Sequence, residues 1–171
     1  MKRWTLLAGA VLLAACSTPP SPPAQQAIKS PAPPVRDLVA QVRAAAEADD
    51  ALAVSPLRDP QIEDLRAEAE RLERDGKYRQ AAAVLARALE TVPDDPELLQ
   101  HAAELAIYRK AWTEAVELAS RSYHLGPRLG PLCRRNWTAL RVIYELHAQD
   151  EHAALAREKL AQCTVEPPVR M

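Results

Sequence analysis

Two stretches of the chain share one pattern at a spacing of 34 residues. The first reads Gly76-Lys77-Tyr78-Arg79-Gln80-Ala81, and the second reads Lys110-Ala111-Trp112-Thr113-Glu114-Ala115. The same offset pairs Leu65 with Leu99, Ala69 with Ala103, Leu72 with Ala106, Leu85 with Ala119, Ala88 with Ser122, Leu89 with Tyr123 and Pro93 with Pro127. Small residues recur where helices must approach closely, bulky residues lie between them, and a proline closes each unit. A period of this length indicates stacked repeats that share a continuous core.

The composition favours helices and excludes one class of partner. Apolar residues make up 48% of the chain, yet only 4% are aromatic and Phe is absent, so Ala and Leu dominate the core. Such residues suit closely packed helices better than strands. With 22 Lys and Arg against 23 Asp and Glu, the chain lacks the basic surplus that nucleic-acid binding requires.

The repeated pattern resembles the tetratricopeptide repeat, whose units of two antiparallel helices stack into a right-handed solenoid. The small, aromatic and proline positions of that family fall on Ala69, Ala81, Ala88, Tyr78 and Pro93 in unit one (62–95), and on Ala103, Ala115, Ser122, Trp112 and Pro127 in unit two (96–129). The resemblance implies an all-α, tetratricopeptide-like right-handed solenoid over residues 61–163. An unrelated Ala-rich bundle of helical hairpins is the alternative.

A third, divergent hairpin is expected over residues 130–163, as a cap for the stack, with a flexible tail over 164–171. Its helices are expected at about 132–148 and 151–163. With the turn near residue 149, Cys133 and Cys163 lie level on facing stripes, so a structural disulfide is predicted. Buried free thiols, a metal pair and a catalytic cysteine are the alternatives. A metal would need two more ligands, and His147 and His152 lie at the other end of the hairpin.

The N-terminus has the features of an export signal over residues 1–15. A positive start at Lys2 and Arg3 precedes an apolar run that is too short to span a bilayer. The run ends Leu13-Ala14-Ala15-Cys16, which resembles the lipobox of bacterial lipoproteins. The resemblance implies a covalent lipid on Cys16, and Ser17 favours the outer membrane facing the periplasm. An ordinary signal peptide with an incidental cysteine, or a short anchor helix, is the alternative.

The segment after the lipobox is expected to be a tether followed by a helix. Residues 16–34 contain seven prolines and no apolar period, which predicts a disordered, extended spacer. A Pro-rich ligand for another protein is the alternative. The next segment, 35–55, is predicted as amphipathic, with a helix over about 35–53 whose stripe comprises Val35, Leu38, Val39, Val42, Ala45, Ala46 and Leu52.

The solenoid resemblance also implies a partner-binding groove. In the family, the first helix of each unit supplies the concave face. The corresponding residues here are Glu63, Arg66, Glu70, Glu73, Glu97, Gln100, Glu104, Ile107, Tyr108, Arg134, Thr138 and Arg141. This face changes from acidic to basic along the stack, and its acids suit a Lys- or Arg-bearing segment. Merely solvated side chains are the alternative.

The sequence predicts a non-enzymatic role. It contains no nucleophile elbow, phosphate loop, dinucleotide fingerprint or zinc-protease motif. No catalytic, metal or cofactor site is expected apart from the lipid on Cys16. The first hypothesis is a membrane-anchored adaptor of the cell envelope that binds a protein or peptide through its concave face. The rival is a structural lipoprotein that self-associates as a homo-oligomer without a peptide ligand.

Overall fold

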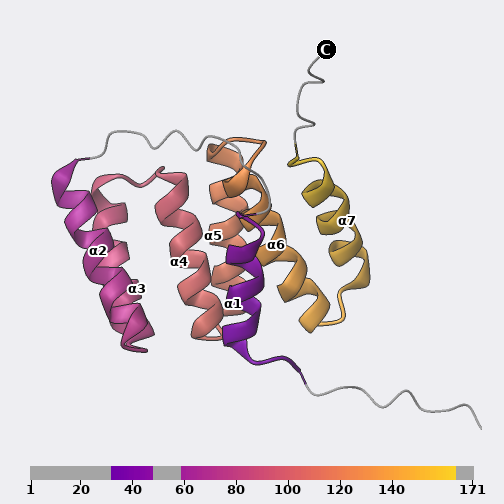
Figure 1. Cartoon of the computed structure of the whole chain (residues 1–171), viewed down its shortest axis with the longest axis horizontal. Coiled ribbons are helices and arrows are strands. Elements are labelled where there is room, and N and C mark those ends of the chain that lie inside the picture. Colours follow the sequence, from indigo (N-terminus) through magenta and orange to yellow (C-terminus); the bar gives the residue numbers. More distant parts are fainter. Residues whose placement is uncertain (1–31, 48–58, 165–171) are drawn as a thin grey trace, which may run out of the picture. The chain divides into compact units, whose positions relative to one another are not determined.

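The structure, a computed structural model, describes residues 32–47 and 59–164 (Figure 1). The predictions for the signal peptide, for Cys16 and for most of the tether and the tail therefore lie outside the described residues. Within these ranges the chain forms helices and no strand. None of the described helices combines the length and apolar character that crossing a bilayer requires.

Seven helices make up this part of the chain. They are α1 (Val35–Ala44), α2 (Pro60–Arg74), α3 (Tyr78–Thr91), α4 (Pro96–Tyr108), α5 (Trp112–Leu125), α6 (Pro131–Leu146) and α7 (Asp150–Ala161). The last six form three antiparallel hairpins in chain order, α2/α3, α4/α5 and α6/α7 (Figure 1). The first hairpin also packs against the second through α3 and α4, and the second packs against the third through α5 and α6. This arrangement is an all-α, tetratricopeptide-like solenoid, as the 34-residue period predicted.

The small residues of the repeat pattern lie at the centre of the helix packing. Six of them are fully buried, with no exposed surface: Ala69, Ala81, Ala88, Ala103, Ala115 and Ser122. A residue without a long side chain lets two helix backbones approach closely, and neighbouring large residues such as Leu85 and Leu105 fill the remaining space. The prediction that these positions are helix contacts is therefore confirmed.

The three hairpins turn in the same way. After the first helix of each pair, one residue adopts a positive φ: 73° at Gly76, 59° at Lys110 and 52° at Ala148. The amide of the following residue then donates to a carbonyl five positions earlier in each case, with N–O distances of 2.8 to 2.9 Å. This is the Schellman arrangement of a helix end. Its recurrence at Ala148 marks the third hairpin as a divergent repeat with a longer first helix.

A disulfide closes the terminal hairpin. Cys133, in the first turn of α6, is bonded to Cys163, just after α7, with their Cα atoms 5.6 Å apart. The amide of Gly130 donates to the Cys163 carbonyl at 2.8 Å. Both links lie at the open end of the hairpin, opposite the turn at Ala148.

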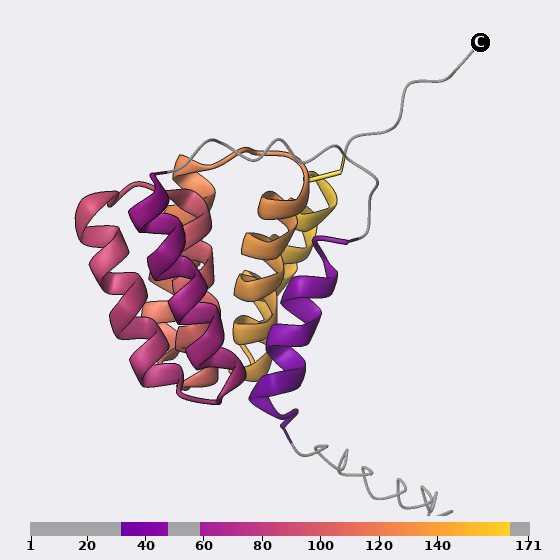
Figure 2. The same ribbon diagram turned by 60° about the vertical axis from the view of Figure 1, so that its left-hand side comes forward.

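Helix α1 packs on the stack instead of extending it. It contacts α4 and α6, the first helices of units two and three, and it lies along α6 in Figure 2. It is shorter than the predicted helix, because it ends at Ala44 and a turn follows over residues 45–47. The Arg134 side chain donates to the carbonyls of Ala45 and Ala46, and these carbonyls belong to the turn that ends the helix. Residues 48–55 of the predicted segment lie outside the described part.

Candidate functional site

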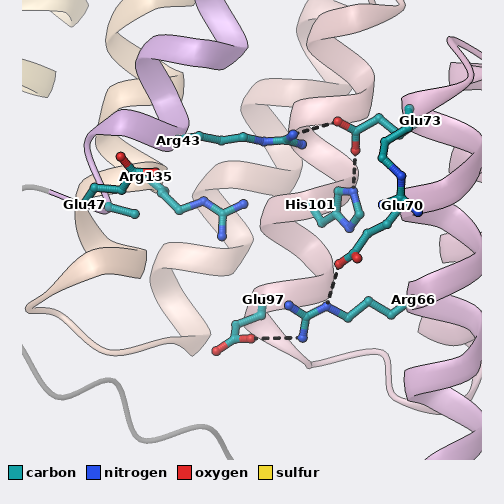
Figure 3. Close-up of a pocket in the computed structure, with 10 residues that line it drawn as sticks. Arg43, Glu47, Arg66, Glu70, Glu73, Glu97, His101 and Arg135 are labelled. Atoms are coloured by element: carbon teal, nitrogen blue, oxygen red, sulfur yellow. Dashed lines mark hydrogen bonds and ion pairs between the residues drawn. The ribbon is translucent and has the colours of Figure 1, made fainter.

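A charged pocket lies where α1, α2, α4 and α6 meet (Figure 3). Its volume is about 460 Å³, and we call it the charged pocket throughout. Its lining comprises Arg43, Ala46, Glu47, Arg66, Glu70, Glu73, Arg74, Glu97, His101 and Arg135. Four of the residues predicted for the groove, namely Arg66, Glu70, Glu73 and Glu97, line it, and a fifth, Glu63, forms an ion pair with Arg66.

The inner part of the charged pocket is a tight network around Arg43. This side chain reaches from α1 to two carboxylates, 2.7 Å from Glu73 and 2.8 Å from Glu104. The Nε2 atom of His101 lies 2.8 Å from the other oxygen of Glu73 and donates to that carboxylate. Arg135 donates to Glu104 at 2.6 and 3.0 Å. One network thus joins α1, α2, α4 and α6.

The network shifts the pKa values of Glu73 and Arg43. Burial alone would raise the pKa of Glu73, but hydrogen bonds from His101 and Arg43 outweigh it and lower this pKa to about 2. Burial alone would lower the pKa of Arg43, yet its bonds with Glu73 and Glu104 raise that pKa above the ordinary value. Both groups therefore stay charged over the physiological pH range.

The outer part of the pocket is looser. Arg66 lies among three carboxylates, at 3.5 Å from Glu70, 3.6 Å from Glu97 and 3.8 Å from Glu63. All four side chains are between 32% and 47% exposed. These distances are longer than those around Arg43, and exposed pairs contribute little to stability. This end carries more acid than base and can exchange partners with a ligand.

Three residues predicted for the groove are not open to a partner. Gln100, Glu104 and Ile107 are all fully buried on α4. Glu104 is covered because it bonds to Arg43 of α1, and Ile107 belongs to the core cluster that contains the buried face of α1. The prediction that they face solvent is therefore corrected, since α1 occupies the place where a ligand would contact them.

Of the remaining four predicted residues, three have partners for their side chains. The Tyr108 ring stacks on Tyr78 with a centroid distance of 4.2 Å, which joins unit one to unit two. Arg134 is 5% exposed and holds the end of α1, and the Thr138 side chain is also buried. Arg141 forms an ion pair with Glu145 on its own helix. None of these four lines the charged pocket.

Besides Ala46, sequence reasoning missed five charged or ionisable residues that line the charged pocket: Arg43, Glu47, Arg74, His101 and Arg135. Arg43 and Glu47 lie outside the apolar stripe predicted for a helix that does not belong to the repeats. Because the register says nothing about where that helix packs, no pattern linked Arg43 to Glu73 or Glu104. His101 and Arg135 each directly follow a residue predicted for the groove. This adjacency in the sequence was the only signal that could have indicated them.

Nine of the ten residues that line the charged pocket are charged or ionisable. It contains no cysteine or serine beside a base. Over residues 32–47 and 59–164, His, Cys, Asp and Glu form no group of three that could hold a metal ion. What the pocket offers is a set of carboxylates and guanidinium groups for ion pairs and hydrogen bonds.

Comparison with known proteins supports the repeat interpretation. A family model described as tetratricopeptide repeat matches residues 62–105, which cover unit one and most of α4. Tetratricopeptide repeats generally mediate protein–protein interactions. No curated protein matches this chain.

Proposed function

We propose that this protein is a lipid-anchored, non-enzymatic adaptor of the bacterial cell envelope. It holds a basic segment of a partner protein in the charged pocket. The carboxylates of Glu63, Glu70 and Glu97 bind Lys or Arg side chains of that segment, and the exposed Arg74 of the lining donates to its carboxylates or backbone carbonyls.

The observation that carries the proposal is the contrast within the pocket. Around Arg43 the ion pairs are short and partly buried, so they are part of the fold. Around Arg66 they are long and exposed, and three carboxylates share one guanidinium group. An incoming cation can replace Arg66 beside any of these acids with little loss of stability. This half of the concave face is therefore the part best suited to a partner.

Two features support the placement in the envelope. Leu13-Ala14-Ala15-Cys16 has the residue order of a lipobox, and the Pro-rich segment that follows would let the domain reach about 55 Å from a bilayer. The bond between Cys133 and Cys163 favours an oxidising compartment such as the periplasm, because disulfides persist there and are rare in the cytosol.

The test of the binding site is a charge reversal of the full chain in its native envelope. We expect Glu70→Lys combined with Glu97→Lys to lose at least about tenfold of the partner recovered by cross-linking and co-purification. The matched control reverses Glu90 and Glu117, which are exposed on α3 and α5 and line neither the charged pocket nor its rim. Equal recovery by the two double variants would disprove the pocket as the binding site.

The test of the anchor is separate. Labelled palmitate should enter the wild-type chain and not a Cys16→Ala variant, and the variant should leave the membrane fraction. If both forms stay in the same fraction without label, the lipid anchor is disproved while the pocket proposal stands on its own test. A homo-oligomer that recovers no other protein would instead favour the structural role.

A further inference from the structure

The surface of α4 and α6 beneath α1 has the features of a helix-binding site. Leu38, Val39 and Val42 of α1 are at most 3% exposed. They share one core cluster with side chains from α4 and α6, including Ile107 and Val142. An apolar stripe from one short helix thus lies against a stripe formed by two helices of the solenoid.

The same surface recognises a helix end through its backbone. Arg134, in the first turn of α6, donates to the carbonyl of Ala45 at 2.7 Å and to that of Ala46 at 3.2 Å. The last carbonyls of a helix have no partner within the helix and carry partial negative charge. Any helix that ends here can offer carbonyls to Arg134, so this contact does not depend on the side chains of α1.

The site retains its main charge pairing when α1 is absent. The fully buried Glu104 accepts from Arg135 and from Gln100, and neither donor belongs to α1. The Oε1 atom of Gln100 and the hydroxyl oxygen of Thr138 are buried without a hydrogen-bond partner in the described part of the chain. These two residues lie one helical turn from Glu104 and Arg134, respectively, which contact α1, so two unsatisfied polar atoms lie close to the α1 contacts.

Helix α1 itself depends on this docking. It has ten residues, and isolated helices shorter than about 12–15 residues are marginal in water. Within residues 32–47 and 59–164, the long-range ion pairs of α1 come from Arg43, whose side chain is 40% exposed. The helix is therefore held by one apolar stripe and by contacts at its C-terminal end.

We propose that α4 and α6 form a helix-binding site, and that a partner's amphipathic helix exchanges with α1 on it. The partner helix carries the pattern of α1: two adjacent apolar residues, then a third apolar residue three positions later, followed directly by Arg. Exchange of α1 would also open the inner part of the charged pocket, because Arg43, Ala46 and Glu47 line it. The helix-binding site does not use the outer acids Glu70 and Glu97, so it stands even if those acids bind no partner.

The test uses a labelled peptide with the sequence of residues 32–47 and three forms of the full chain. The first form is the wild type. The second carries Val39→Asp and Val42→Asp, which undock α1. The third is a matched control with Ala40→Asp and Gln41→Asp on the exposed face of α1. Docked α1 occupies the site and therefore weakens its apparent affinity for the peptide. We expect the undocked form to bind the peptide at least about tenfold more tightly than the other two forms.

Equal binding by all three forms, at unchanged helix content, overturns the proposal. Hydrogen exchange on the wild type gives a measurement that does not depend on the variants. We expect the amides of α1 to exchange faster than those of α4 and α6, because α1 opens without the stack. If α1 is protected as strongly as α4, it leaves only on global unfolding and the proposal is wrong. A wild-type dimer that the undocked variant converts to a monomer also overturns it, because α1 then serves a second copy.

Discussion

Glu70 and Glu104 occupy the same position in consecutive repeats, yet their surroundings are opposite. Both lie on the first helix of a unit, 34 residues apart. The side chain of Glu70 is 45% exposed and lies 3.5 Å from Arg66 on its own helix. That of Glu104 is fully buried and accepts from Arg43, Arg135 and Gln100. The repeat determines the direction in which a side chain points, but α1, a helix outside the repeat, determines what the side chain meets.

The difference divides the concave face into an open half and a covered half. The open half is the α2 side, where a partner can exchange with the native ion pairs. The covered half is the α4 and α6 side, where α1 already fills the site. If both proposals hold, a solenoid of three hairpins presents two kinds of recognition surface, one charged and one apolar.

The most direct way to break the comparison is to remove each carboxylate in turn. Glu104→Ala leaves two arginines without their buried acceptor, so we expect a loss of about 3–5 kcal/mol in the free energy of unfolding. Glu70→Ala removes only an exposed pair, and we expect less than about 1 kcal/mol. Urea unfolding of both variants at one pH measures the difference. Equal losses would show that Glu104 is not buried by α1.

The disulfide offers a second test of the difference between the open and the covered half, because it links α6 to the end of α7 on the covered side. Replacing Cys133 and Cys163 with Ser removes a cross-link across 30 residues. In the chain-entropy model this costs about 3.5 kcal/mol. We expect hydrogen exchange to accelerate in α6, α7 and α1 more than in α2 and α3. A uniform acceleration would mean that the two halves unfold as one unit.

Glu73 lies between the open and the covered half, and its ionisation can be followed through the pH dependence of stability. Its folded pKa of about 2 lies below the ordinary value of 4.5, so its contribution to stability is complete above pH 4.5 and is lost as the pH falls towards 2. The shift corresponds to about 3 kcal/mol. We expect Glu73→Gln to be less stable than wild type at neutral pH and to lose less on acidification. Parallel stability curves for the two proteins would contradict the assignment.

The smallest expected difference concerns the two helix N-caps. Asp95 accepts from the amides of Glu97 and Leu98 at the start of α4, whereas among the described residues Asp59 accepts from the amide of Gln61 at the start of α2. We expect Asp95→Ala to cost about 1–2 kcal/mol and Asp59→Ala about 0.5–1 kcal/mol. Thermal unfolding of the two variants measures this ranking. If Asp59→Ala costs more stability than Asp95→Ala, the helix caps do not follow the division of the concave face into an open and a covered half.

The 34-residue repeat pattern in the sequence predicted most of the fold. Small residues such as Ala69 and Ala103 marked the helix contacts because only short side chains fit there, and the turn between α6 and α7 placed Cys133 level with Cys163. The register could not reveal the packing of α1. The bond from Arg43 to Glu104 spans 61 residues, and that from Arg134 to Ala45 spans 89. No local period encodes contacts of this range, so Glu104 looked equivalent to Glu70 in the sequence.

The cross-link between Cys133 and Cys163 makes the two ends of the stack unequal. A linear array of repeats unravels from whichever terminus is least restrained. The α7 end is cross-linked by the disulfide and α1 packs on α4 and α6, whereas among the described residues α2 is tied to α1 and α4 through ion pairs of Glu73 and Arg66. We expect thermal fraying to begin at the end without a cross-link, and therefore to involve α2, the helix that contributes most residues to the charged pocket. If the charged pocket binds the proposed partner segment, that segment would restrain α2, and occupancy of the pocket would stabilise the first repeat.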